Sequence, residues 1–511
     1  MRKPLMSDDI PMKFGVPWIT LYVAAGFAMV YAYIVFFIVG IMEPGHFGRH
    51  VFDAWYLSVM DGRMDLPARV IRFEGSYSED GQAFLYQGMG PLLTRFVIGP
   101  FVDLSQVSLA GISILFWTVL GTVLFQLALV RAAVASWAPR EGAGTIGYVL
   151  LTVALWLGGP GLFLVSNISH YHEPIAVSYA AAGLFLLCWA GVIQQRWPMR
   201  RALVPLALAA VLAMHARPEV GVGLTLGVLI AVLGAWRADR GGAILAICGA
   251  FVVLAIGGIA MLAVNELRFG SWFGPAGDSP RVYGNLFWGI EAPDSARMAA
   301  FEAHGTFNLL RALPNILFYT FSPPKLFFPE AYNTAETLYQ SVTMPVLGFI
   351  RVEWFAGGAL FLWMTWALLG VRALRAPWDV VRAHLGLVLA TGAAALLLVS
   401  YGTVTSRYIV SIWPLFAALA LMGLSVPLRA ASGTGPARRA AVLLIVATVL
   451  SAQWNWTTAK TYRNLLTEQP GSYFQVWTPE FCQQLATRKG FDAARTAEIC
   501  RKPFTAGPEG A

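Results

Sequence analysis

Residues 24–42 read AAGFAMVYAYIVFFIVGIM, an apolar run without a single charged side chain. The hydrocarbon core of a bilayer is roughly 30 Å thick, so an α-helix crosses it with about 20 apolar residues. A helix also satisfies its own backbone hydrogen bonds, which lipid cannot do. The run therefore predicts a membrane-spanning helix near the start of the chain.

Further apolar runs of this kind follow along the chain. They lie at residues 107–130, 146–165, 174–193, 202–214, 220–235, 244–264, 354–371, 387–404, 409–426 and 441–454. The composition agrees, because 57% of the 511 residues are hydrophobic and 13% are charged, whereas soluble domains are about a quarter charged. We therefore expect an all-α, polytopic integral membrane protein with about eleven transmembrane helices.

The net charge of +8 is better explained by topology than by nucleic-acid binding. Lys and Arg gather in alternate short loops, for example Arg131 and Arg140, Arg196, Arg200 and Arg201, Arg237 and Arg240, and Arg372, Arg375 and Arg382. Positively charged loops stay in the cytoplasm. The pattern predicts a cytoplasmic N-terminus, with the C-terminus on the outer side.

The chain is expected to hold one transmembrane domain, residues 1–460, and a short outward tail, residues 461–511. Two long outer loops, residues 43–105 and 266–353, belong to the domain. In the first loop, Asp53–Met64 and Pro91–Val102 predict short amphipathic helices. The outer side permits a disulfide between Cys482 and Cys500 in the tail.

Asp53, which follows the first span, is the leading catalytic candidate. A carboxylate at the membrane–water boundary can act as a general base on a hydroxyl group. The structural alternative is a charge that stabilises the first turn of a helix. Asp61, Asp65 and Glu74 are further acids in the same loop.

Two short outer loops carry polar residues in an apolar setting, where such residues are costly. The first holds His170, His172 and Glu173, which predict either a metal site or the polar rim of a cavity. The second holds His215 and then Arg217 and Glu219, which predict either an ion pair or contact with a ligand.

Three more cations, Arg268, Lys325 and Arg407, are expected at the outer boundary of the membrane. Each could extend its charged end to water without a ligand. Several of them around one cavity would instead form an anion site, because Arg pairs well with phosphate. Tyrosines nearby are expected to line such a cavity or to anchor the protein at the interface; they are Tyr56, Tyr86 and Tyr408.

The order of these motifs resembles the GT-C superfamily of membrane glycosyltransferases, in particular its aminoarabinose-transferase-like and protein-mannosyltransferase-like branch. The resemblance covers roughly residues 15–460. The motifs that carry it are Asp53-Ala-Trp-Tyr56, Gly62-Arg-Met-Asp-Leu-Pro67, Phe73-Glu-Gly, Tyr86-Gln-Gly, Pro91-Leu-Leu, Asn265-Glu-Leu-Arg-Phe-Gly-Ser271, and Ser406-Arg-Tyr408 with Pro414.

The resemblance implies a bacterial inner-membrane enzyme with a periplasmic active site. Such enzymes move a sugar from a polyprenyl-phosphate donor to a glycan, lipid or protein acceptor, and a divalent cation could take part. Asp53 would be the base, with Glu173 as a further acid. The cavity lining would include His170, His172, His215 and Glu219, and the donor-phosphate ligands would come from Arg217, Arg268, Lys325 and Arg407.

The sequence departs from the family pattern at two places. Phe52 stands where many relatives carry a second acid, and no acid follows Arg407 and Tyr408 in the late span. Two other classes of protein stay open at this point. A transporter would place ionisable groups near the bilayer midplane, and a lipid-linked-glycan binding protein would share the cavity without catalysis.

Overall fold

The computed structural model describes residues 12–42, 45–71, 75–78, 82–136, 143–273, 282–283, 296–426, 434–466, 492–494 and 497. Within these residues, nine helices are long and apolar enough to cross a membrane. The chain is thus a polytopic, almost wholly helical membrane protein, as predicted. Glu74, Cys482 and Cys500 lie outside the described residues.

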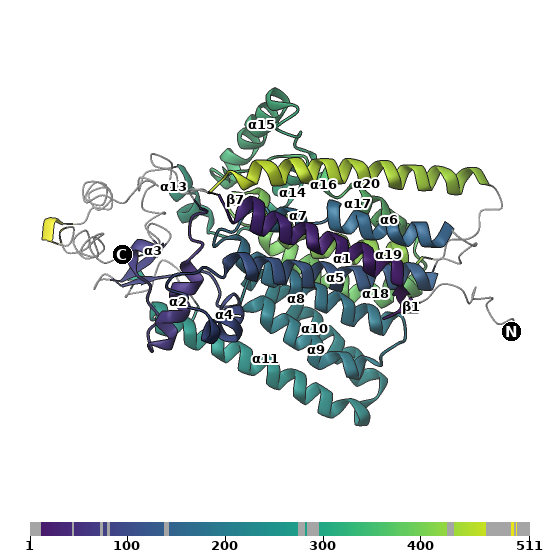
Figure 1. The fold of residues 1–511 in the computed structure, drawn as a ribbon, viewed down its shortest axis with the longest axis horizontal. Helices are drawn as coiled ribbons and strands as arrows, with labels where there is room; N and C mark the ends of the chain where they lie inside the picture. Colours follow the sequence, from purple (N-terminus) through teal and green to yellow (C-terminus); the bar gives the residue numbers. More distant parts are fainter. Residues whose placement is uncertain are drawn as a thin grey trace.

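The nine spans lie side by side along the long axis of the molecule (Figure 1). They are α1 (Trp18–Tyr33) with η1 (Ile34–Val39), α5 (Ala110–Ser136), α6 (Ala143–Gly158) with α7 (Gly161–Val165), α8 (His172–Ile193), α10 (Pro218–Ala238), α11 (Arg240–Phe269), α18 (Trp378–Val399), η6 (Ser406–Tyr408) with α19 (Ile409–Leu424), and α20 (Thr434–Arg463).

Two of the eleven predicted spans are shorter helices in the same bundle. Residues 202–214 belong to α9 (Met199–Met214), which packs along α10 and α11. Residues 354–371 were expected to form one span, but Gly357 and Gly358 have φ of +68° and +62°, which a right-handed helix cannot contain. Helical structure starts at α16 (Ala359–Leu362), and α17 (Met364–Val371) and η5 (Arg372–Arg375) follow.

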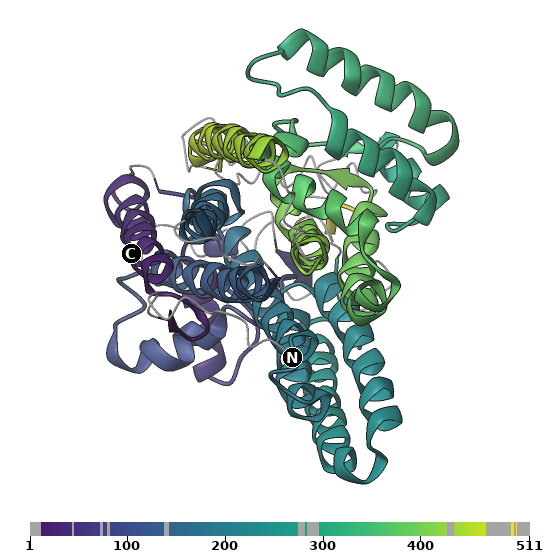
Figure 2. The same cartoon turned by 90° about the vertical axis from the view of Figure 1, so that its right-hand side faces the viewer.

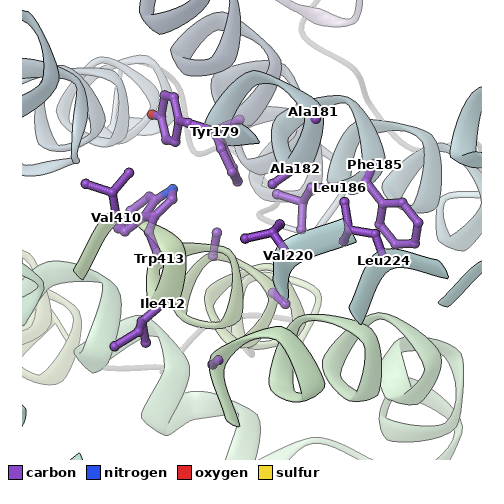
Figure 3. Packing of buried hydrophobic residues seen from close by; sticks show 14 of the residues in the cluster. Tyr179, Ala181, Ala182, Phe185, Leu186, Val220, Leu224, Val410, Ile412 and Trp413 are labelled. Carbon is purple, nitrogen blue, oxygen red and sulfur yellow. The ribbon is translucent and has the colours of Figure 1, made fainter. Parts of the chain in front are cut away.

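The core lies between α5, α8, α10 and α19. Figure 3 shows Tyr179, Phe185, Leu224 and Trp413 packed there, and all four are almost fully buried. Small residues let these helices approach closely, as is common between membrane helices. A Cβ on Gly223 of α10, for example, would lie 2.5 Å from the carbonyl oxygen of Ala390 in α18.

Short elements gather at one end of the bundle, which we call the α2 end (Figure 1). They are α2 (Val51–Met60), α3 (Ala68–Ile71), α4 (Leu92–Ile98), η3 (Gly99–Phe101), α13 (Ala296–His304), and the antiparallel strands β3 (Ser76–Ser78), β4 (Ala83–Phe84) and β5 (Val282–Tyr283). The first-loop helices α2 and α4 begin within two residues of the predicted starts of the two amphipathic helices.

After α13, the second long loop continues as a helical hairpin at the side of the bundle. It consists of η4 (Leu309–Arg311), α14 (Ala312–Phe321) and α15 (Pro329–Leu347). After it, β6 (Arg351–Val352) pairs in parallel with β7 (Thr403–Val404), which directly precedes η6. The predicted span at residues 387–404 therefore ends early, because α18 stops at Val399 and the chain turns into β7.

At the opposite end of the bundle lie β1 (Met12–Lys13), β2 (Val16–Pro17) and several of the basic loops. Arg131 donates a hydrogen bond of 2.6 Å to the Phe14 carbonyl there. Arg200 pairs with Asp239 at 3.1 Å. The described basic residues Arg131 and Arg200 thus lie at one end, away from α2.

Candidate functional site

The loops that carry the sequence candidates contact one another at the α2 end. Phe47 of the first loop donates a backbone hydrogen bond to the Leu466 carbonyl just after α20. Gly90 donates one to the His215 carbonyl at the turn between α9 and α10. The structure therefore brings together segments that are more than a hundred residues apart in the sequence.

Asp53 lies in the first turn of α2 and is fully buried. Its Oδ1 accepts hydrogen bonds from Arg95 Nε at 2.9 Å and from the Leu109 backbone N–H at 3.3 Å. Its Oδ2 accepts one from the Ser108 hydroxyl at 2.9 Å. The nitrogen Nδ1 of His50 lies 3.9 Å from Oδ2, and the His50 side chain is 43% exposed.

Arg95 is the partner that the sequence interpretation missed. The guanidinium also pairs with the Glu173 carboxylate at the start of α8, and it donates to the Pro91 carbonyl at 3.3 Å. All three charged side chains are buried. We call Asp53, Arg95 and Glu173 the buried triad; it joins α2, α4 and α8.

The buried triad is not fully satisfied. Within the described residues, Arg95 Nη2 and Glu173 Oε2 have no hydrogen-bond partner. Burial lowers the pKa of Arg95, against the attraction of Asp53, which raises it. A signal for Arg95 was present in the sequence, because an Arg inside the apolar Pro91–Val102 segment needs a partner.

The other first-loop acids lie elsewhere. Asp61 is exposed and follows the last residue of α2. Asp65 is partly exposed and pairs with Arg63 at 3.0 Å. Tyr56, expected to line a cavity, is instead buried between α2 and α4, with its ring centroid 5.5 Å from that of Phe96.

A second group of residues surrounds Arg407 in η6. The guanidinium is nearly buried and lies over the rings of Tyr171 at 4.5 Å, Trp354 at 5.5 Å and Tyr408 at 5.5 Å. Its Nη1 has no hydrogen-bond partner among the described residues. We call this arrangement the Arg407 cage.

Arg217 approaches the same cage from the turn before α10. Its guanidinium lies 5.2 Å from the Tyr408 ring centroid. Arg217 Nη2 is 2.6 Å from Glu219 Oε1, so the ion pair expected as one alternative is present. Burial by itself would lower the pKa of Arg217, but Glu219 and Tyr408 raise it above its usual value.

The two histidines of the short outer loop form part of the wall beside the cage. The ring centroid of His170 lies 4.0 Å from that of Tyr171, and the His172 centroid lies 5.2 Å from that of Tyr462. The Nε2 atoms of both histidines have no partner within the described residues. Burial lowers the pKa of His170 to about 3, and the nearby Arg407 also lowers it.

The metal interpretation of this loop gains no support. Across the described ranges, no group of three His, Cys, Asp or Glu side chains is placed to hold a metal ion. The Nδ1 atom of His172 meets the Leu164 carbonyl at 3.1 Å, and Glu173 is held by Arg95. The three residues therefore serve two different groups, the cage and the buried triad.

A cavity of about 160 Å³ lies on the other side of the turn between α9 and α10. Its polar lining comes from Tyr86, His215, Asn265 and Arg268, and the rest is largely apolar. Arg268 donates to the carbonyls of Leu85 and Gln87 and to Asn265 Oδ1, at 2.7 to 2.9 Å. Its hydrogen bonds tie the first loop to α11, and its role as a phosphate ligand stays a prediction.

Lys325 also lies apart from the buried groups. Its side chain is exposed, and Nζ is 4.8 Å from the Tyr332 ring centroid of α15. The family resemblance implies a donor-phosphate role for all four cations. In the structure, the nearly buried Arg407 and the partly exposed Arg217 share a tyrosine ring. Arg268 instead binds backbone carbonyls, and Lys325 presents an exposed amine.

The fold is similar to that of an archaeal oligosaccharyltransferase from Archaeoglobus fulgidus in its apo form, with 13% identity and a TM-score of 0.48. It is also similar to the oligosaccharyltransferase AglB of that organism in complex with an inhibitory peptide and a dolichol-phosphate, with 13% identity and a TM-score of 0.47. Each match covers 94% of this chain and 59% of the other.

The chain thus spans about three fifths of the length of these solved structures. No family model matches the sequence, and neither does any curated protein sequence. The likeness is distant and describes the path of the chain.

Proposed function

We propose that the chain is a membrane glycosyltransferase. It would move a sugar from a polyprenyl-phosphate donor to a hydroxyl of a glycan, lipid or protein acceptor at the α2 end, which the charge distribution predicts to be the outer side. The observation that carries the proposal is the Arg407 cage, where a nearly buried guanidinium keeps an unused donor beside a second guanidinium.

Glu353, which pairs with Arg351 at 3.5 Å, also attracts the Arg407 guanidinium. The unused Nη1 donor still favours an anion, because a buried donor without an acceptor is costly. Phosphate suits a guanidinium in particular, since two N–H groups can donate to two oxygens. Arg407 opens a membrane span, so the anion would arrive at membrane level. A lipid phosphate fits that position better than a free nucleotide sugar.

The proposed chemistry is a displacement at the anomeric carbon. The acceptor oxygen forms a bond to that carbon, the bond to the phosphate oxygen breaks, and the acceptor proton passes to a base. The lipid phosphate leaves with its negative charge opposite Arg407 and Arg217. Such charge stabilisation is typically the largest single contribution to rate.

Asp53 is the proposed base, although both of its oxygens are engaged. A base must come within hydrogen-bond reach of the proton, and such bonds often form only in the complex with substrate. We propose that the acceptor hydroxyl approaches Asp53 Oδ2 and takes the place of the Ser108 hydroxyl there. The half-exposed His50 lies on that side. Asp61, Asp65, Glu74 and Glu173 are the alternative bases.

The test uses purified protein in nanodiscs and a polyprenyl-phosphate hexose. Arg407→Gln is expected to lose donor binding, measured by native mass spectrometry, whereas Arg200→Gln at the opposite end should bind like wild type. Asp53→Asn should keep donor binding and lose donor consumption by about 10²-fold or more, as expected for removal of a general base. Chelation by EDTA tests whether turnover also needs a divalent cation.

Three results would contradict the proposal at different levels. If Arg407→Gln binds the donor as tightly as the wild type does, Arg407 does not bind the donor phosphate. If Asp53→Asn turns over the donor as fast as the wild type does, Asp53 is not the general base. The same substitution test then applies to the other acids. Tight donor binding without any product, for every acceptor class, would instead identify a lipid-linked-glycan binding protein.

A further inference from the structure

The second long loop presents a surface that the proposed function does not use. From Phe307 to Phe321, every exposed residue is a large apolar one: Phe307, Leu309, Leu310, Leu313, Ile316, Leu317 and Phe321. The turn after α14 exposes three more, Leu326, Phe327 and Phe328. Such a continuous apolar surface is rare on a face that meets water.

The opposite face of α14 is firmly fixed to the bundle. Asn315 Nδ2 donates to the carbonyls of Val399 and Tyr401 at the end of α18, at 2.6 and 3.1 Å. Phe318 stacks on Tyr339 of α15 with ring centroids 4.4 Å apart. The outward direction of the leucines is therefore set by contacts on the inner face.

The turn after α14 reaches the side of a span. The ring centroid of Phe327 lies 5.3 Å from that of Trp454 in α20. Trp454 precedes the last residue of α20, Arg463, by nine residues, which corresponds to about 13 Å along the helix axis. Phe327 thus lies beside the span and well below its end.

The apolar surface of the hairpin continues that of the neighbouring spans. Leu389 and Leu396 of α18 and Val449 and Leu450 of α20 are exposed. Figure 2 views the molecule along its long axis, so that α20 is seen nearly end-on, whereas the green hairpin helices are seen lengthwise beside the bundle. The hairpin therefore runs across the direction of the spans.

We infer that η4, α14 and the turn at residues 326–328 form an in-plane anchor, embedded in the lipid leaflet at the α2 end of the bundle. Its partner is the lipid bilayer that surrounds the spans. Residues 309–321 would extend about 20 Å as a helix, too short to cross, and an amphipathic helix of this kind lies at the boundary of headgroups and acyl chains.

The second helix of the hairpin is mixed in character. Exposed polar residues of α15 gather on one side, which consists of Glu330, Asn333, Thr334, Thr337 and Ser341. Exposed apolar residues such as Leu338 and Val342 lie next to them. Lys325, at the turn, has an exposed amine beside three apolar side chains. An amine in that position reaches toward anionic phosphates of the headgroups.

The anchor also contacts the segment that carries the Arg407 cage. Tyr319 of α14 meets Thr405 through hydrogen bonds of 3.1 and 3.4 Å. The Lys325 backbone N–H donates to the Ala356 carbonyl, and the Ala356 N–H donates to the Ser406 hydroxyl. The anchor thereby fixes the height of η6 relative to the bilayer surface.

The test uses single cysteines labelled with an environment-sensitive fluorophore, in the full chain with its four native cysteines replaced. Leu313→Cys and Leu317→Cys report on the anchor, and Thr334→Cys and Thr337→Cys on the polar face of α15 are the matched controls. In nanodiscs, the fluorophores at residues 313 and 317 should be quenched by spin-labelled lipid. They should be protected from quenching by iodide in the aqueous solution. The controls should behave in the opposite way.

Other outcomes contradict the inference. Iodide quenching at residues 313 and 317 equal to that at residue 334 would place the face in water. Protection from both quenchers would mean that a protein, such as a second copy of this chain, covers it. Lipid quenching at all four positions would place the whole hairpin in the membrane. None of these readouts depends on glycosyl transfer. A negative result would therefore contradict the membrane anchor without contradicting the proposed function.

Discussion

At the scale of single residues, Arg95 decides how the first loop is held. It carries one positive charge between two buried carboxylates, those of Asp53 and Glu173. A buried ion pair offers little net stability compared with apolar packing, but removing one partner leaves an unpaired buried charge. The residue is therefore more sensitive to substitution than its apolar surroundings suggest.

Arg95→Met is expected to reduce the free energy of unfolding by about 3–5 kcal/mol, because it leaves two buried carboxylates without a cation. The measurement is thermal or denaturant unfolding in detergent, followed by tryptophan fluorescence. The matched variant adds Asp53→Asn and Glu173→Gln to Arg95→Met, and it should recover part of the loss. Unchanged unfolding of Arg95→Met would show that the triad contributes nothing.

His46 predicts a pH dependence of stability. Burial lowers its pKa to about 4, Arg49 and Arg463 also disfavour its charged form, and the hydrogen bond to the Arg463 carbonyl opposes both. In the unfolded chain a His titrates near 6.5. Between these values the unfolded chain binds a proton that the folded chain does not, so stability falls as the pH drops from about 6.5 to 4.

The variant His46→Gln keeps a hydrogen-bond donor and does not titrate. We expect it to flatten the dependence of the melting temperature on pH between 6.5 and 4. The slope has contributions from other buried histidines, such as His170, so it should decrease without vanishing. An identical slope in wild type and variant would mean that His46 is not buried in the folded protein.

At the scale of elements, the close contact between the first loop and the turn before α10 shapes the α2 end. A Cβ on Gly88 would lie 2.1 Å from the His215 carbonyl oxygen. Gly90 donates its N–H to that same oxygen at 2.6 Å. The absence of side chains at these two positions lets two backbones meet between the cavity and the Arg407 cage.

Gly88→Ala is expected to destabilise the protein by about 1–3 kcal/mol, because the added methyl group forces a backbone apart. It should also lower donor binding if Arg217 moves with the turn. Gly258→Ala in α11 is the matched control, since its Cβ would have no neighbour within 4 Å. Equal melting temperatures for the two variants would contradict the close packing.

At the scale of the whole molecule, the two ends of the bundle differ in chemistry. Basic side chains such as Arg131 and Arg200 lie at one end. The buried triad and the Arg407 cage lie at the other. Because basic loops stay in the cytoplasm, the α2 end is predicted to face outward.

This orientation can be tested with single cysteines and a membrane-impermeant thiol reagent in intact cells. Asp61→Cys at the α2 end should react without permeabilisation. Arg200→Cys should react only after the membrane is opened. The reverse pattern would invert the topology and place the proposed chemistry in the cytoplasm.

The sequence by itself determined that the chain is a bundle of membrane helices and located the nine long spans, because long apolar runs have few alternatives to a helix in lipid. It overestimated their number, since two of the eleven predicted spans are shorter helices. It also pointed to Asp53, Glu173, Arg217 and Arg407, since charged groups near spans are costly and stand out. It did not predict the break at Gly357 and Gly358, which are left-handed and pack so closely on Pro323 and Pro324 that a Cβ would clash.

The tertiary structure alone decided which charges meet. Arg95 joins residues 42 positions before and 78 positions after it, and nothing in a linear pattern reports such distant contacts. The same holds for Arg268, which binds backbone carbonyls of the first loop, and for the α14 leucines, whose outward direction follows from packing on α18. Lipid fixes where helices form, whereas side-chain packing between them fixes which polar groups come together.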